Sequence, residues 1–83
     1  MTDQDAREAI KKAFYDAYLR HGLYVIVDTK RVATEAGLDA AQTRRCLDYL
    51  EAKGLIRALT LAGGYRPLVA LVDSIEQEQG QRR

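Results

Sequence analysis

Apolar residues recur at helical spacing along the first quarter of the chain, which is typical of one buried face of a helix. The stripe consists of Ala6, Ala9, Ile10, Ala13, Phe14, Ala17 and Tyr18. The other side carries most of the charged residues, which are Arg7, Glu8, Lys11, Lys12 and Asp16. Thr2 or Asp3 can cap the start, and Gly22 is a stop signal. The pattern therefore predicts an amphipathic helix from Asp5 to about Arg20.

The next segment predicts a short extended stretch followed by a second helix. Leu23–Val27 is apolar and rich in β-branched residues, so we expect it to be extended or a small strand. Asp28-Thr29 provides an N-cap for a helix over Lys30–Ala36, and Gly37 ends that helix.

A third helix is predicted to begin at Asp39. Gln42 stands in the position that completes a capping box with Asp39, and Gly54 provides the C-terminal stop. The residues expected to face inward are Thr43, Cys46, Leu47, Tyr49 and Leu50.

Two apolar runs separated by a glycine pair predict a β-hairpin after the third helix. The first strand is expected over Leu55–Leu61, the turn over Ala62–Gly64 and the return strand over Tyr65–Val72. Pro67 has no N–H to donate, which favours an edge position for the return strand. The hairpin is therefore expected to be small and exposed on one side.

The remaining features define one domain. With 83 residues, we expect a single domain over residues 1–76, with a short helix opening at Asp73–Glu76 and a polar, frayed tail over residues 77–83.

The composition bears on where the protein resides. The apolar content of 47% suits a folded core, no apolar run is long enough for a membrane span, and the acidic start is unlike a secretory signal. The single cysteine, Cys46, cannot form an internal disulfide. These features favour a soluble cytoplasmic protein.

Val32–Leu38 resembles the first helix and turn of a helix-turn-helix unit, in which a small residue, a glycine and an apolar plug occupy fixed places. Here these are Ala33, Gly37 and Leu38. Gln42–Ile56 looks like the recognition helix of winged-helix regulators, and its tail, Leu-Glu-Ala-Lys-Gly-Leu-Ile, is similar to that of MarR-like families. The resemblance covers Asp28 to Val72. It implies an α+β, mostly helical fold: a three-helix winged helix-turn-helix with a C-terminal β-hairpin wing.

The resemblance also implies binding of double-stranded DNA and transcription regulation, with the third helix in the major groove. Exposed Ala40, Ala41, Gln42, Arg44 and Arg45 would then lie near the bases, since arginine suits guanine and glutamine suits adenine. Lys30 and Arg31 would lie over phosphates, and Arg57, Tyr65 and Arg66 would belong to the wing. The expected DNA-binding residues are Lys30, Arg31, Ala41, Gln42, Arg44, Arg45, Arg57 and Arg66.

Charge leaves a second interpretation open. The formal net charge is +1 and the sequence pI is about 7.9, whereas dedicated nucleic-acid binders often exceed a pI of about 9. From Asp28 to Arg57 there are six basic and five acidic residues, so Arg44 and Arg45 could form a solvated face with Asp48 and Glu51. A surplus of one positive charge would hold a single copy only weakly on DNA, so we expect DNA binding as a homodimer. The alternative is a protein–protein interaction module or a subunit of a larger nucleoprotein complex, which the short, uncharged wing tip also suits.

Signals for an enzyme are lacking, since the sequence has no phosphate-binding glycine loop and no nucleophile–base pair. The sole histidine, His21, is expected at a helix end, and with Cys46 distant in sequence no metal-ligand set is formed.

Cys46 is expected to be buried and inert, with a redox switch as the alternative. Tyr15, Tyr18 and Tyr24 lie in or near the first helix, where a tyrosine usually packs its ring. Tyr18 is expected to pack, while Tyr15 is left open between packing and an interface. We expect no cofactor, metal, small molecule or membrane partner.

Overall fold

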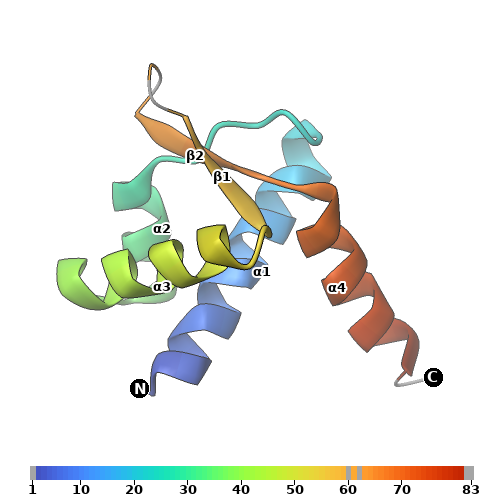
Figure 1. Ribbon diagram of the computed structural model, residues 1–83, viewed down its shortest axis with the longest axis horizontal. Helices are drawn as coiled ribbons and strands as arrows, with labels where there is room; N and C mark the ends of the chain where they lie inside the picture. The colour runs from blue at the N-terminus through green and yellow to red at the C-terminus, as the bar shows by residue number, and fades with distance from the viewer. Residues whose placement is uncertain (1, 60, 62, 82–83) are drawn as a thin grey trace.

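The computed structural model describes residues 2–59, 61 and 63–81 and is mostly helical, as predicted (Figure 1). Within these residues the elements follow the order α1 (Asp3–His21), α2 (Thr29–Ala36), α3 (Ala40–Ala52), β1 (Ile56–Leu59), β2 (Gly64–Pro67) and α4 (Val69–Gln81). Figure 1 shows α1 in the middle, with α2 and α3 on one side and α4 on the other. An α+β fold with a hairpin after the third helix is thus confirmed, and it is compatible with a winged-helix arrangement.

Each of the first three helices begins at the side chain that the sequence offered as a cap. The Thr2 hydroxyl accepts a hydrogen bond from the Asp5 N–H at 3.1 Å. Asp28 Oδ1 accepts from the Lys30 N–H at 2.8 Å. Such caps satisfy backbone donors that have no partner inside the helix, and each contributes about 1 kcal/mol.

The turn between α2 and α3 has the predicted geometry. Gly37 adopts a left-handed backbone conformation with φ of 70°, which a glycine reaches without strain. The Leu38 N–H then donates to the Ala33 carbonyl at 3.0 Å, and Leu38 packs against the core. Asp39 Oδ1 accepts from the Gln42 N–H at 2.7 Å and so starts α3 directly after the turn.

The hairpin is antiparallel and takes a third segment at its edge. Arg57 lies opposite Arg66, and Ile56 lies opposite Pro67. Val27, in the stretch expected to be extended, forms a bridge with Tyr65 through two backbone hydrogen bonds of 2.7 and 3.0 Å. Residues 60 and 62, part of the predicted strand and turn, lie outside the described residues.

The predicted return strand over Tyr65–Val72 is wrong in its second half. The strand ends at Pro67 and α4 begins at Val69. Leu71 and Val72 are both buried as part of a helix, rather than alternating as in a strand. The helix continues to Gln81, through most of the polar tail, and residues 82–83 lie outside the described residues.

The core lies where α1 meets α3, the hairpin and α4. Its largest buried side chains are Phe14, Ile10, Leu47, Leu50, Ile56 and Leu71. Lys11, expected on the polar side of α1, is buried because α4 packs over it. Its Nζ lies 3.5 Å from Ser74 Oγ, 3.8 Å from a Glu8 carboxylate oxygen and 3.9 Å from one of Glu78. The ammonium therefore keeps polar partners while its stem is covered.

Candidate nucleic-acid interface

Helix α3 separates its residues into a buried side and an outer side. Thr43, Cys46, Leu47 and Leu50 are buried, whereas Ala41, Arg44 and Arg45 are exposed. Tyr49 was expected to face inward, and this is wrong: it is exposed beside Arg7 and Lys53. The side chains of Arg44 and Arg45 are 74% and 60% exposed. Because the inner side packs against the core, the outer side is held in a fixed orientation. The sequence prediction that these arginines point outward is confirmed.

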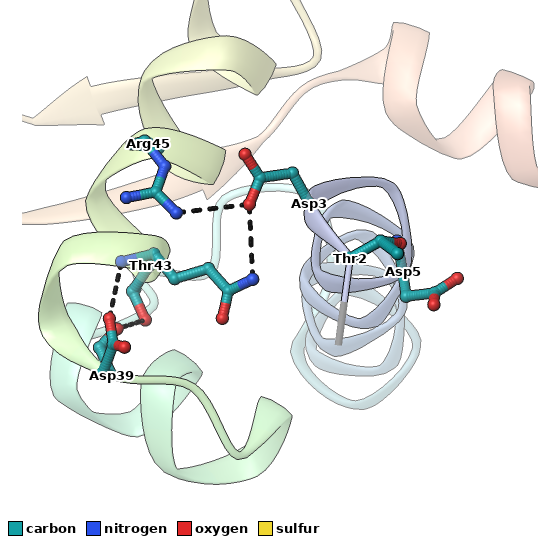
Figure 2. A network of polar contacts seen from close by, with 7 residues as sticks. Thr2, Asp3, Asp5, Asp39, Thr43 and Arg45 are labelled. Atoms are coloured by element: carbon teal, nitrogen blue, oxygen red, sulfur yellow. Dashed lines mark hydrogen bonds and ion pairs between the residues drawn. The ribbon is translucent and has the colours of Figure 1, made fainter.

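The start of α1 reaches two of the predicted base-reading side chains. Figure 2 shows Asp3 beside α3, with its carboxylate turned toward Arg45. Asp3 Oδ1 accepts hydrogen bonds from Gln42 Nε2 at 3.3 Å and from Arg45 Nη2 at 3.2 Å. Gln42 is only partly exposed, and its amide and the Arg45 guanidinium share one carboxylate supplied by a segment about 40 residues away in the chain.

This contact changes the acid–base properties of both partners. The hydrogen bond from Arg45 is the main cause that lowers the pKa of Asp3, and the hydrogen bond from Gln42 adds to it. Asp3 in turn raises the pKa of Arg45. Both shifts favour the charged forms, so the contact is an ion pair at neutral pH.

Two further predicted residues also face carboxylates. Arg44 Nε lies 3.4 Å from Asp48 Oδ1, and Arg31 Nε lies 3.1 Å from Glu35 Oε1. Both pairs span four residues of one helix and are exposed, so each contributes only about 0.3–0.5 kcal/mol. Such weak pairs leave the arginines able to exchange a carboxylate for another anion.

Glu51 differs from the expectation of pairing along α3. Its Oε2 accepts a hydrogen bond from the backbone N–H of Ala58 at 3.2 Å and so connects α3 to the hairpin. Asp48 does pair along the helix, with Arg44. The expected pairing along the helix is thus confirmed for Asp48 and wrong for Glu51.

Three of the predicted basic residues have no carboxylate within ion-pair distance in the part of the chain that the structure describes. These are Lys30, in the first turn of α2, and Arg57 and Arg66 on the hairpin. The guanidinium carbon of Arg66 lies 5.0 Å from the centre of the Tyr24 ring, and its Nη1 donates to the Leu23 carbonyl at 3.4 Å.

Sequence reasoning missed Tyr24, which it grouped with tyrosines that usually pack. Tyr24 is instead 79% exposed at the edge of the hairpin. Tyr15 and Tyr18 are partly buried on α1, and their ring centres lie 6.0 Å apart. Tyr24 and Ile26 are exposed while Val27 is buried, as in an extended segment, but alternation alone does not decide which side faces the core.

Other chemistry finds little support in the described residues. Cys46 is buried, as predicted, and this burial is the main cause that raises the pKa of its thiol, which disfavours the reactive thiolate. His21 is exposed in the last turn of α1. Residues 2–59, 61 and 63–81 contain no group of three potential metal ligands, and none of their helices is both long and apolar enough to cross a bilayer.

We compared the chain with models of protein families, with curated proteins and with solved structures. None of the three comparisons finds a match. The function is therefore inferred from the fold and from the residues on its surface.

Proposed function

We propose that the chain is a small winged helix-turn-helix protein that binds double-stranded DNA, with α3 in the major groove, as a transcriptional regulator or an accessory nucleoprotein factor. One observation carries the proposal: Arg44 and Arg45 are exposed on the first half of a helix that the Gly37 turn sets against α2. In helix-turn-helix proteins this half of the second helix lies against the base edges.

The side chains at this surface suit the chemistry of the groove. Arginine can donate two hydrogen bonds to guanine, glutamine can pair with adenine, and the methyl group of Ala41 suits a thymine methyl. Lys30, in the first turn of α2 and without a carboxylate partner in the described chain, suits a phosphate. Arg57 and Arg66 extend the positive charge to the hairpin.

The charge balance indicates how strongly one copy would bind. Arg31, Arg44 and Arg45 must each release a carboxylate before they bind DNA, which lowers the net gain from every contact. One copy would therefore bind weakly, and a homodimer on two half-sites would bind more tightly. The solution mass, measured with and without duplex DNA by sedimentation, tests for this dimer.

The test of the proposal compares two double variants against duplex DNA of about 20 base pairs, which is about two helical turns. Arg44→Ala with Arg45→Ala should weaken binding about tenfold or more at low salt, because each base contact contributes about 1–3 kcal/mol. Lys12→Ala with Lys53→Ala also removes two positive charges, but from exposed sites outside the interface. This control should change the affinity less than about threefold, since only long-range attraction is lost.

Two results would contradict the proposal. One is unchanged binding by the α3 double variant. The other is an equal loss in both double variants, which would show that overall charge, not the face of α3, governs binding. In the parent, affinity should also fall steeply with salt, because bound phosphates release their counterions.

The second candidate is a protein–protein interaction module. The mixture of charges favours it, because Arg44 and Asp48 alternate along the outer side of α3 as they do on many solvated helix faces. In that case the solution mass should show a stable dimer whose assembly Arg44→Ala weakens, and duplex DNA should not compete.

A further inference from the structure

The outer face of the hairpin carries two neighbouring positive charges. Ile56 and Pro67 face each other and are both buried, so the next pair along the ladder, Arg57 and Arg66, lies on the opposite face. Directly opposed residues lie close together, and like charges in such a pair destabilise a sheet. No carboxylate in the described residues lies within ion-pair distance of either arginine. The face is thus complementary to an anion.

An exposed aromatic ring lies beside one of these charges. Arg66 approaches the ring of Tyr24, with 5.0 Å between the guanidinium carbon and the ring centre, yet the tyrosine remains 79% exposed. Ile26 is also exposed on this edge. A large aromatic surface left in water next to arginines suits a flat, partly apolar ligand that carries negative charge.

The position of the ring is fixed by the backbone. The segment carrying Tyr24 and Ile26 pairs with β2 through the Val27–Tyr65 bridge. In Figure 1 this segment, which follows α1, passes beside β2. At Gly64 an added Cβ would lie 2.9 Å from Ile26 Cγ2 and 2.9 Å from the Val27 carbonyl oxygen. The close approach of this segment to the strand therefore depends on glycine at position 64.

We propose that this face, made by Tyr24, Arg57 and Arg66, binds single-stranded DNA, with one base stacked on Tyr24 and the adjoining phosphates on the two arginines. A single strand is favoured over a duplex because its bases are free to stack, and aromatic rings beside basic groups are the means by which proteins hold such strands. The choice of DNA over RNA rests on the proposed function. The stacking itself does not, because it uses none of the residues on α3.

The experiment measures the affinity of the full chain for a labelled oligothymidylate of about eight nucleotides by fluorescence anisotropy. Tyr24→Ala should weaken binding about fivefold or more, the effect of losing one stacked base. Tyr24→Phe keeps the ring and should bind within about twofold of the parent. Tyr49→Ala is the matched control, because Tyr49 is also exposed and lies beside cations, here Arg7 and Lys53, but belongs to α3.

A second arm uses the unaltered chain, so it decides the question even if Tyr24→Ala fails to fold. An abasic oligomer with the same phosphates should bind about fivefold or more weakly than oligothymidylate. Equal affinity for the two oligomers, or no effect of Tyr24→Ala, would overturn the proposal. Tighter binding of oligouridylate than of oligothymidylate would overturn the choice of DNA.

The same measurement separates this proposal from the function proposed for α3. Arg44→Ala with Arg45→Ala should leave oligothymidylate binding within about threefold, since only long-range charge is lost. If duplex binding fails while oligothymidylate binding depends on Tyr24, only the function proposed for α3 falls. If a loss of single-strand affinity follows the α3 variant and not Tyr24→Ala, the hairpin face is not the site.

Discussion

Nη2 of Arg45 lies 3.2 Å from Oδ1 of Asp3. The first turn of α1 thus holds the Arg45 side chain, for which we propose a contact with the DNA bases. The same Asp3 oxygen accepts from Gln42. A carboxylate in this place occupies donors that a base edge or a phosphate would use. Asp3 therefore competes with the proposed ligand from within the chain.

Replacing this carboxylate should strengthen duplex binding. Asp3→Asn removes a negative charge beside α3 and frees Arg45, and because exposed ion pairs contribute about 0.2–1 kcal/mol, the expected gain is about two- to fivefold. Asp5→Asn is the control, since it makes the same change of charge two residues further along α1. Anisotropy titrations of both variants against one duplex measure the difference. Equal gains would mean that charge alone is responsible.

The pKa of Asp3 should report the contact directly. The pKa lies below the ordinary value of 3.8, chiefly because Arg45 hydrogen-bonds to the carboxylate, so any stabilisation by the pair is present above pH 3.8. This stabilisation is lost as the pH falls below 3.8 and passes through the lowered pKa of Asp3. A carbon-detected NMR titration should place the Asp3 midpoint below 3.8 in the parent and closer to 3.8 in Arg45→Ala. An unchanged midpoint in that variant would show that Arg45 is not the cause.

The turn before α3 should tolerate few residues at position 37. Gly37→Ala puts a side chain on a backbone with φ of 70°, which costs about 1–2 kcal/mol of unfolding free energy. Gly37→Asn should cost less, because asparagine tolerates this conformation better. Urea denaturation monitored by circular dichroism measures both. A stability of Gly37→Ala equal to that of the parent would show that the turn does not require a left-handed residue.

Helix α4 should contribute strongly to stability through one side chain. Leu71 is fully buried, so Leu71→Ala should cost about 2–5 kcal/mol of unfolding free energy. Val69→Ala changes an exposed residue of the same helix and should cost no more than about 0.5 kcal/mol. Urea denaturation compares the two. Similar costs would contradict the placement of Leu71 against the core.

The parts of the fold that the sequence predicts best are those that depend on neighbouring residues. The caps at Thr2, Asp28 and Asp39 and the stop at Gly37 each act within a few residues, and all four occur in the structure. The start of α4 was missed for a related reason. Four consecutive apolar residues from Val69 to Val72 fit a strand or a buried helix equally well, and periodicity cannot separate the two.

The candidate site was predictable only in part. That Arg44 and Arg45 point outward follows from the inward positions of Cys46 and Leu47 on the same helix. The contact between Asp3 and Arg45 joins residues 42 positions apart, and no local pattern contains it. The exposure of Tyr24 likewise depends on the pairing of its segment with β2, which the sequence of that segment does not specify.

Helix α1 touches both proposed surfaces. Its first turn meets α3 through Asp3, and the segment that leaves its last turn joins the hairpin at Tyr65. With 19 residues, the helix is a rod about 28 Å long, and its packed middle leaves it little freedom to bend. The two surfaces are also joined directly, because only three residues separate α3 from β1 and Glu51 Oε2 accepts the Ala58 N–H. They therefore keep one relative position, and α1 supports it from both ends.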